Sequence, residues 1–292
     1  MNYLANPTET KAVLQLFGFD IKKKYGQNFL IDENTVRKIV LKAGVTKEDT
    51  VLEIGPGIGT MTQILCEESK KVVAVEIDSK LIPVLSETLS MFDNVTVINE
   101  DVLKCDIREI SKVYNEGMAL KVVANLPYYI TTPIIMGLLE NYADIIESVT
   151  VMIQKEVADR INARPGTKDY GALTLATEYY ASVSKVADVS ASCFIPRPNV
   201  DSSVIRLDIY KERPVKVRDE RLLFKLIRAA FAQRRKTMVN SVSAVTDFSK
   251  EEIKEALCLI GKSENIRGEV LSLEEFAALS DRLCSVSNDT VM

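Results

Sequence analysis

The chain has 292 residues, of which 47% are hydrophobic and 27% charged, and it contains no histidine. This length and composition are typical of a globular protein with one large or two modest domains and a substantial core. Without histidine, Ser-His-Asp and Cys-His catalysis are excluded, and most catalytic zinc sites are disfavoured.

The five cysteines lie far apart in the sequence, and none forms a C-x-x-C pair. This argues against a disulfide framework or a zinc site, and it fits a reducing cytoplasm. The chain has no 18-residue apolar stretch and no basic-then-apolar leader. We therefore expect a cytoplasmic protein with no bound metal, no membrane span and no secretory signal.

The formal net charge is −4, but it is unevenly distributed. Residues 211–236 hold ten Lys or Arg and three Asp or Glu, whereas residues 247–292 hold five and ten. A basic segment inside an acidic chain can form a face that binds phosphate. A charge run is, however, more often a solvated helix surface.

Weak helical periodicity covers the first 20 residues, and from residue 50 strand-like and helical stretches alternate. Helices are expected at Met61–Glu68 and Ser79–Ser90. Strands are expected at Val51–Ile54, Val72–Ile77, Val95–Ile98, Leu120–Ala124 and Val149–Ile153. Such alternation predicts an α/β fold with a doubly wound, mostly parallel sheet covered on both faces.

The pattern changes after residue 180. Residues 182–192 and 202–210 read as two antiparallel strands joined by the turn-rich segment 194–199. Beyond residue 211 the chain is helical in character, with apolar spacing in Arg221–Ala232 and a capping box that begins at Ser272. Pro214 and alternating charges place a boundary near 208–216, which predicts domains at 1–210 and 211–292.

A glycine-rich turn, Gly55-Pro56-Gly57-Ile58-Gly59, follows the first strand of the alternating region. Its glycines permit positive φ and a close approach of backbone to ligand. The spacing is G-x-G-x-G, whereas the nicotinamide fingerprint is G-x-G-x-x-G. A phosphate-loop reading of Gly261-Lys262-Ser263 fails because Ala256 stands where that motif needs glycine.

Three acids, Glu53, Glu76 and Asp101, lie at or near the ends of successive strands beside this turn. Each acid alone would be read as a helix cap. In this order, Glu76 can accept hydrogen bonds from both hydroxyls of a ribose, and Asp101 can accept a hydrogen bond from an adenine amine. The set predicts a site for S-adenosylmethionine, with S-adenosylhomocysteine as product and with no pyrophosphate subsite.

The tetrapeptide Asn125-Leu126-Pro127-Tyr128 ends the fourth strand of this series. The carboxyl ends of strands in open α/β sheets are where ligands bind. An amide or carbonyl oxygen here can accept a hydrogen bond from an exocyclic amine, and the tyrosine ring can stack on the base. The alternative is a tight strand-to-helix turn punctuated by proline.

With these motifs, the chain resembles the ribosomal RNA adenine dimethyltransferases over about residues 10–280. Those motifs are Gly26-Gln27-Asn28-Phe29-Leu30, the glycine turn, Val75-Glu76-Ile77-Asp78, Glu100-Asp101 and Asn125-Leu126-Pro127-Tyr128-Tyr129. The small-subunit type of this family is indicated by Tyr170-Gly171-Ala172-Leu173, by the segment from Pro196 to Ser202, and by the segment from Phe231 to Thr237.

The resemblance implies a seven-stranded sheet with a small all-α carboxyl-terminal domain. It implies dimethylation of two adjacent adenosines in a hairpin loop near the 3′ end of 16S rRNA, within a 30S assembly intermediate, coupled to subunit maturation. Nothing in the sequence demands more than a monomer. The cofactor contacts implied are Asn28, Leu30, Gly55, Gly57, Glu76, Asp101 and Asn125.

For catalysis we expect Asn125 and the Leu126 carbonyl to accept the amine hydrogens, Pro127 to shape the turn and Tyr128 to stack on the base. Phe29 and Phe194 are candidate partners on the other face of the base, with core packing as the alternative for Phe29. The residues expected to face RNA are Arg218, Arg221, Lys225, Arg228, Arg234, Arg235 and Lys236.

Three other functions are compatible with parts of the sequence. A 23S rRNA adenine methyltransferase that confers antibiotic resistance would share the amino-terminal motif and the Asn-x-Pro-aromatic turn. The protein could instead be a mainly non-catalytic ribosome-assembly binder, although intact cofactor and target motifs argue against this. A DNA adenine methyltransferase is the third, disfavoured by the length of the downstream match.

Overall fold

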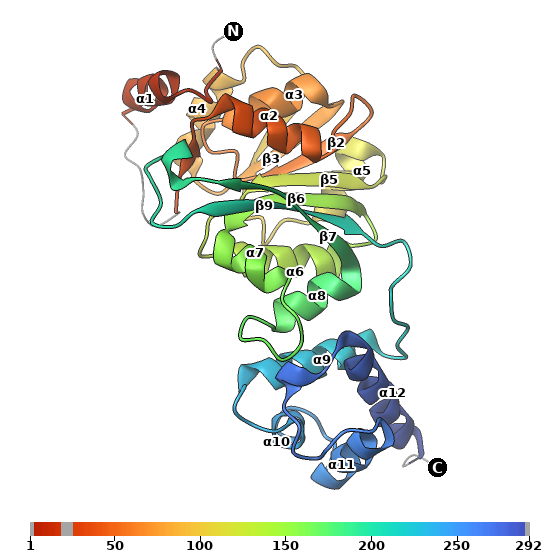
Figure 1. Cartoon of the computed structure of the whole chain (residues 1–292). Coiled ribbons are helices and arrows are strands. Elements are labelled where there is room, and N and C mark those ends of the chain that lie inside the picture. The colour runs from red at the N-terminus through yellow and green to blue at the C-terminus, as the bar shows by residue number, and fades with distance from the viewer. Residues whose placement is uncertain (1–2, 19–25, 290–292) are drawn as a thin grey trace. The chain divides into compact units, whose positions relative to one another are not determined.

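The computed structural model describes residues 3–18 and 26–289, and it contains a seven-stranded sheet with the strand order β4-β3-β2-β5-β6-β9-β7 (Figure 1). The first five of these strands are parallel, and β9 is antiparallel to β6. The strands span β2 Thr50–Ile54, β3 Lys71–Glu76, β4 Val95–Asn99, β5 Leu120–Asn125, β6 Ile146–Gln154, β7 Ala181–Val189 and β9 Ser202–Ile209. The predicted mostly parallel α/β sheet is confirmed.

The central strands form where the sequence has short runs of β-branched residues. All five residues of β2 are buried, and so are five of the six residues of β5. Both faces of such strands must be covered, because a parallel sheet carries helices on each side. Figure 1 shows α2 (Glu33–Lys42) and α3 (Thr60–Glu68) on one face and α6 (Thr131–Tyr142) on the other.

Two short strands pair outside the large sheet and were not expected from the sequence. Strand β1 (Phe29–Leu30) is antiparallel to β8 (Phe194–Ile195), with Phe29 opposite Ile195 and Leu30 opposite Phe194. The Ile31 amide also donates to the Cys193 carbonyl at 2.8 Å. This pairing ties the amino-terminal motif to the loop between β7 and β9.

Contacts divide the chain into two compact units, residues 1–158 with 182–209, and residues 159–181 with 210–292. The remaining helices of the first unit are α1 Pro7–Leu16, α4 Ile82–Thr88 and α5 Ile107–Asn115, with 3₁₀ turns at Ser79–Leu81 and Ala191–Cys193. Helix α7 (Lys155–Ile161) runs from the first unit into the second. The functional division expected at residue 210 stays a prediction.

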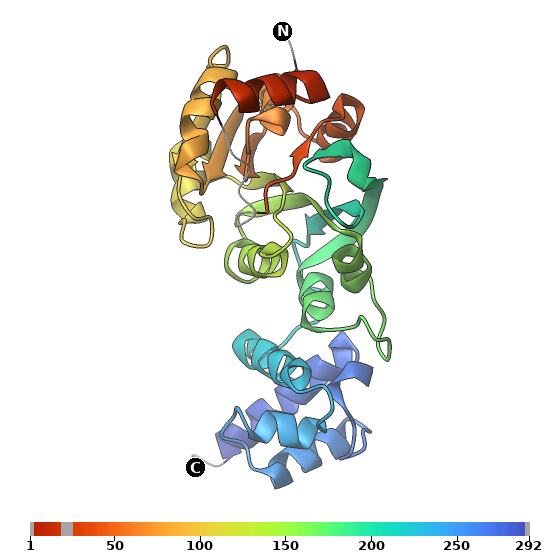
Figure 2. The same ribbon diagram turned by 90° about the vertical axis from the view of Figure 1, so that its left-hand side faces the viewer.

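The second unit is helical. It contains α8 Ala172–Tyr180, α9 Glu220–Ala232, α10 Met238–Ser243, α11 Lys250–Leu259 and α12 Leu273–Asp289, with a 3₁₀ turn at Gly268–Val270. Figure 2 shows α9 to α12 grouped together, in cyan to dark blue. The capping box expected at Ser272 is present, because Ser272 and Glu275 exchange hydrogen bonds ahead of α12. Within the described ranges, no helix is long and apolar enough to cross a membrane.

Candidate active site

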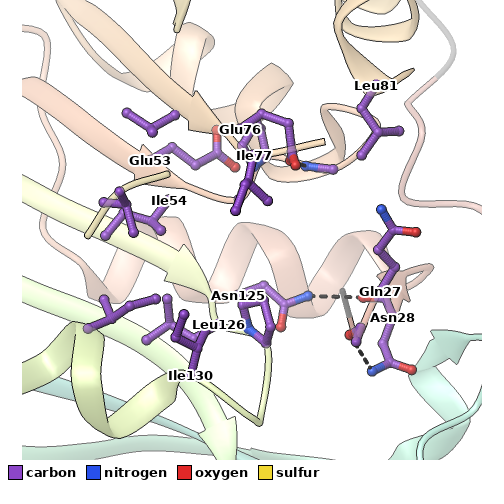
Figure 3. Close-up of a pocket in the computed structure, with 18 of the residues that line it drawn as sticks. Gln27, Asn28, Glu53, Ile54, Glu76, Ile77, Leu81, Asn125, Leu126 and Ile130 are labelled. Atoms are coloured by element: carbon purple, nitrogen blue, oxygen red, sulfur yellow. Dashed lines mark hydrogen bonds between the residues drawn. The ribbon is translucent and has the colours of Figure 1, made fainter. Parts of the chain in front are cut away.

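A pocket opens at the carboxyl ends of β2, β3 and β5, where the glycine turn begins (Figure 3). Gly55, Gly57 and Gly59 have φ values of 68°, 61° and 94°, which lie in the left-handed region that favours glycine. The Gly55 amide donates to the Val75 carbonyl at 2.9 Å, so the turn stays joined to β3. This geometry exposes backbone to a ligand just before the amino end of α3.

Glu76, the last residue of β3, connects the glycine turn to the next segment. Its carboxylate accepts from the Gly57 amide at 3.2 Å and from the Asp78 amide at 2.8 Å. Burial raises the pKa of Glu76, and the two backbone amides oppose that rise by favouring the charged form. A carboxylate held in this way keeps lone pairs available for a pair of ligand hydroxyls.

Glu53 is the most unusual group in the pocket. It lies on β2 and is 1% exposed, and its Oε2 atom has no hydrogen-bond partner among the described residues. Burial, reinforced by the nearby negative charge of Glu76, raises the pKa of Glu53 to about 8. Ionising a buried carboxyl that has one unpartnered oxygen is costly, so this position is suited to a cationic ligand.

The charge of the wall indicates what kind of ligand the pocket takes. Four acidic side chains contribute to it, and none of the described lining residues is lysine or arginine; the acids are Glu53, Glu76, Glu100 and Asp101. Such a wall disfavours a pyrophosphate and favours a molecule with positive charge. The residues therefore fit the sulfonium cofactor predicted from the sequence better than a dinucleotide.

The adenine end of the predicted site combines an acid with an apolar surface. Asp101 lies in a turn after β4 and accepts from the Leu103 amide through one oxygen, Oδ1. Ile77 follows Glu76, lines the pocket and is 42% exposed, a high value for a large apolar residue. A planar ring could cover it. Sequence reasoning missed Ile77, and it counted Glu53 among the acids without assigning it a contact.

The Asn125 side chain is held across the pocket opening. Its Nδ2 donates to the Asn28 carbonyl at 3.1 Å, and the side-chain Nδ2 of Asn28 donates in turn to the Gly26 carbonyl at 3.0 Å. Because only the nitrogen of an amide can donate to a carbonyl, Oδ1 of Asn125 is left as an acceptor. Figure 3 shows Asn125 and Leu126 on the side of the pocket opposite Glu53 and Glu76.

The remainder of the turn is anchored at both ends. The Leu126 amide donates to the Met152 carbonyl at 3.1 Å, and the Pro127 carbonyl accepts from the Thr131 hydroxyl at 3.1 Å. Tyr128 lines the pocket, and its hydroxyl shares a hydrogen bond with the Ser202 hydroxyl at 2.7 Å. Burial raises the pKa of Tyr128, so the phenol remains neutral at neutral pH.

The two phenylalanines expected to contact the base are both buried. Phe29 is 5% exposed and lines the pocket beside Gly57, whereas Phe194 is 3% exposed in a different hydrophobic cluster. Leu30 is buried in the same cluster as Phe194. Base stacking by either ring stays a prediction.

The basic residues expected to face RNA belong to the second unit. Arg221, Lys225 and Arg228 are exposed along one side of α9, while Leu223, Leu226, Ile227 and Ala230 are buried on the other. Arg235 and Lys236 are also exposed. Two other members make contacts within the unit: Arg218 donates to the Ser285 hydroxyl, and Arg234 donates to the Lys168 carbonyl, each at 2.8 Å.

The structure therefore brings together the predicted cofactor set and the Asn125 turn around one pocket. The cofactor and target motifs come from residues 26–30, 53–57, 76–77, 100–102 and 125–130. Within the described ranges, no group of three or more Cys, Asp or Glu side chains could hold a metal ion. The roles expected for individual residues stay predictions.

Comparison with known proteins agrees with this geometry. A family model described as ribosomal RNA adenine dimethylase matches residues 18–277. The chain is 58% identical to a ribosomal RNA small subunit methyltransferase A of Lachnoclostridium phytofermentans, over 96% of this chain and 98% of the relative. It is 49% identical to the protein of the same description in Clostridioides difficile, over 96% and 97%.

Two solved structures have the same fold. A dimethyladenosine transferase from Plasmodium falciparum matches with a TM-score of 0.70 and 25% identity, over 90% of this chain and 98% of that one. The 23S rRNA methyltransferase ErmE matches with a TM-score of 0.64 and 27% identity, over 88% and 100%.

Proposed function

The chain belongs to the ribosomal RNA adenine dimethylase family, and from this premise we propose which RNA it modifies and how its residues act. It is an S-adenosylmethionine-dependent rRNA adenine dimethyltransferase of the small-subunit type. Its proposed target is a pair of adjacent adenosines in a hairpin loop near the 3′ end of 16S rRNA. The proposed substrate particle is a 30S assembly intermediate, so that methylation is coupled to subunit maturation in the cytoplasm.

The proposed cofactor contacts are those that line the pocket. Glu76 accepts hydrogen bonds from the ribose hydroxyls, and Asp101 accepts a hydrogen bond from the adenine amine. Ile77 covers one face of the adenine ring. Glu53 has a raised pKa, and it would ionise beside the cationic part of the ligand, whose positive charge favours the carboxylate. Gly55 and Gly57 bring backbone groups close to the ligand. Asn28 and Leu30, from the amino-terminal segment, close one side of the pocket. When bound, S-adenosylmethionine supplies a methyl group on a sulfonium that leaves as the neutral thioether of S-adenosylhomocysteine.

The proposed task of the Asn125 turn is to hold the adenine amine in line with that methyl group. The amine lone pair is delocalised into the ring, which makes the amine a poor nucleophile. Asn125 Oδ1 and the Leu126 carbonyl would accept its hydrogens and favour a tetrahedral nitrogen. With the amine held in this way, transfer of the methyl group from the sulfonium to the nitrogen would release the neutral thioether, and the amine proton would pass to solvent.

Tyr128 has a role that follows from how it is held. Its hydroxyl forms a hydrogen bond with the Ser202 hydroxyl, and this bond holds the ring in one orientation in the pocket wall. A fixed ring can stack on an adenine that is extruded from its loop, and stacking contributes about 1–3 kcal/mol per base. Phe29 and Phe194 remain candidates for the opposite face.

RNA binding is proposed for the basic surface of the second unit. Arg221 and Arg228 on α9, followed by Arg235 and Lys236, give this part of an acidic chain a local positive charge. Such contacts should make binding depend strongly on salt concentration. We further propose that the protein acts as a monomer.

The observation that carries the proposal is the convergence of the acidic cofactor wall and the Asn125 turn on one pocket. The test is methyl transfer from radiolabelled S-adenosylmethionine to 30S particles from a strain that lacks its own enzyme, with 23S transcript as the competing substrate. We expect dimethyladenosine at two adjacent positions of 16S rRNA. Label in 23S RNA would instead support the large-subunit activity, and no label would support a non-catalytic binder.

A further inference from the structure

A loop of the second unit, residues 162–169 between α7 and α8, is closely held by neighbouring segments. The Gly166 amide donates to the Glu269 carbonyl at 2.7 Å. Within the loop, the Thr167 hydroxyl donates to the Arg164 carbonyl, also at 2.7 Å. Figure 1 shows this loop, in green, beside one end of α9. These bonds give a surface loop one defined conformation.

Arg234 is the main side chain that fixes the loop. Its Nη1 donates to the Lys168 carbonyl at 2.8 Å, and its Nε lies 3.5 Å from the Glu269 carboxylate. The guanidinium also lies 5.9 Å from the centre of the Phe231 ring. Arg234 therefore joins the end of α9, the loop and the 3₁₀ turn at Gly268–Val270, and its charge is offset by Glu269.

The carboxyl end of the loop is anchored in the core of the unit. Tyr170 is fully buried, and its hydroxyl donates to the Leu271 carbonyl at 2.8 Å. Its ring meets the Phe231 ring edge-on at 5.8 Å. Because Phe231 also contacts Arg234, the aromatic pair and the guanidinium support the same loop.

The two cationic side chains of the loop have no such partners. Arg164 and Lys168 are exposed, and neither side chain forms an ion pair or hydrogen bond among the described residues. The structure uses the backbone of these residues, through the Arg164 and Lys168 carbonyls, and leaves their charges to solvent. The one acid within the loop is Asp169, which is also exposed.

We propose that the 162–169 loop is part of the RNA-binding surface, with Arg164 and Lys168 contacting phosphates and Arg234 acting as the residue that positions them. Exposed cationic side chains on a loop whose backbone is held in place are suited to contact phosphate oxygens. Ordering the loop before binding reduces the entropy lost on association. This inference rests on the proposed function, and it extends the RNA surface to a segment outside the basic stretch 211–236.

The first test removes the two charges. The Arg164→Ala/Lys168→Ala variant is compared with Lys47→Ala/Lys70→Ala, which makes the same charge change in exposed residues ahead of β2 and β3, away from the pocket. Affinity for 30S particles is measured from about 50 to 200 mM KCl. We expect the loop variant to bind about tenfold more weakly and the slope of log K against log salt to fall in magnitude by about 1–2.

Two controls separate this inference from the proposed function. Cofactor affinity should be unchanged in both double variants, and the wild-type protein should methylate 30S particles. If wild type is active but the loop variant binds 30S like the control variant, the loop inference is overturned while the function stands. If wild type does not methylate 30S particles, the proposed function itself is wrong.

The second test concerns Arg234 as a positioning residue. Arg234→Lys keeps the charge but loses the forked geometry that spans the Lys168 carbonyl and Glu269. We expect it to weaken 30S binding severalfold in the wild-type background and to have no further effect in the Arg164→Ala/Lys168→Ala background. A loss of equal size in both backgrounds would mean that Arg234 contacts RNA directly, and the positioning role would be overturned.

Discussion

The Asn125 side chain donates a hydrogen bond across 3.1 Å to the backbone carbonyl of Asn28, a residue that lies 97 positions earlier in the chain. The bond joins the carboxyl end of β5 to the segment that leads into β1. It also determines which atom of the Asn125 amide can accept a hydrogen from substrate. One contact therefore couples closure of the pocket to orientation of the proposed catalytic acceptor.

Replacing Asn125 by aspartate should abolish most of the activity. A carboxylate has no hydrogen to donate, so it would repel the Asn28 carbonyl while keeping nearly the same size. We expect turnover on 30S particles to fall by at least about 100-fold, because the acceptor oxygen is no longer held in the orientation that the reacting amine requires. The measurement is single-turnover methyl transfer with saturating cofactor.

The control for this change is Asn265→Asp, because Asn265 is exposed in the second unit and its side chain makes no hydrogen bond among the described residues. It should retain wild-type turnover. If Asn125→Asp turned over at a rate close to that of this control, the hydrogen bond from Asn125 to the Asn28 carbonyl would not be needed to orient the acceptor oxygen, and that orienting role would be refuted.

Gly57 offers a test of the glycine turn. Its φ is 61°, and a Cβ there would lie 3.2 Å from the Phe29 ring. Gly57→Ala should therefore combine a backbone cost of about 1–2 kcal/mol with a crowded contact next to the cofactor. We expect a loss of affinity for S-adenosylmethionine of at least tenfold, measured by calorimetry.

Gly117 is a matched control for the backbone cost alone. Its φ is 77°, but a Cβ would meet nothing within 4 Å, and the residue does not line the pocket. Gly117→Ala should lower stability to a similar degree and leave cofactor affinity unchanged. Equal affinity losses in the two variants would show that the defect is general and not specific to the turn.

Much of the site was predictable from local sequence, because buried parallel strands are recognisable as short apolar runs. The run Val51–Ile54 became β2 at Thr50–Ile54, and Leu120–Ala124 became β5 at Leu120–Asn125. Once the strands are known, residues that follow them must meet at one edge of the sheet. This is why the acids and the Asn125 turn converge as expected.

Long-range pairing was not predictable in the same way. Strands β1 and β8 have two residues each and lie more than 160 positions apart, so neither leaves a periodic pattern. For this reason the sequence could not reveal that Phe29 and Phe194 are buried. The loop at 162–169 is similar, since its contacts with Arg234 and Glu269 depend on the folded arrangement of the helical unit.

Glu53 should make the stability of the cofactor-free protein depend on pH. Its folded-state pKa of about 8 lies above the ordinary value of 4.5, so the folded protein binds the proton more tightly than the unfolded chain. The resulting stabilisation is complete below pH 4.5 and is lost as pH rises towards 8. At about 1.4 kcal/mol per pKa unit, the loss should amount to a few kcal/mol.

The measurement is urea unfolding of the cofactor-free protein at pH 5, 6.5 and 8. Wild type should lose stability over this range relative to Glu53→Gln, which cannot ionise. An exposed control, Glu87→Gln on α4, should follow the wild-type curve. Parallel curves for wild type and Glu53→Gln would mean that Glu53 is already ionised in the folded protein at pH 5.

Gly268 should tolerate no side chain, because a Cβ there would lie 2.3 Å from the Cβ of Ala230 on α9. Gly268→Ala must push the 3₁₀ turn away from α9, and overpacking of this kind costs about 1–3 kcal/mol. The displaced turn carries Glu269, so RNA affinity should fall as well. Ala230→Gly in the same protein should recover part of the stability by restoring space, despite the helix cost of a glycine.

Gly137 in α6 gives the opposite expectation for the same chemical change. It has no positive φ, and a Cβ there would meet nothing within 4 Å, so Gly137→Ala should raise stability by about 0.5–1 kcal/mol. Denaturant midpoints measure both variants. If Gly268→Ala were as stable as wild type, or if Ala230→Gly gave no rescue, the close approach of the 3₁₀ turn to α9 would not exist in solution.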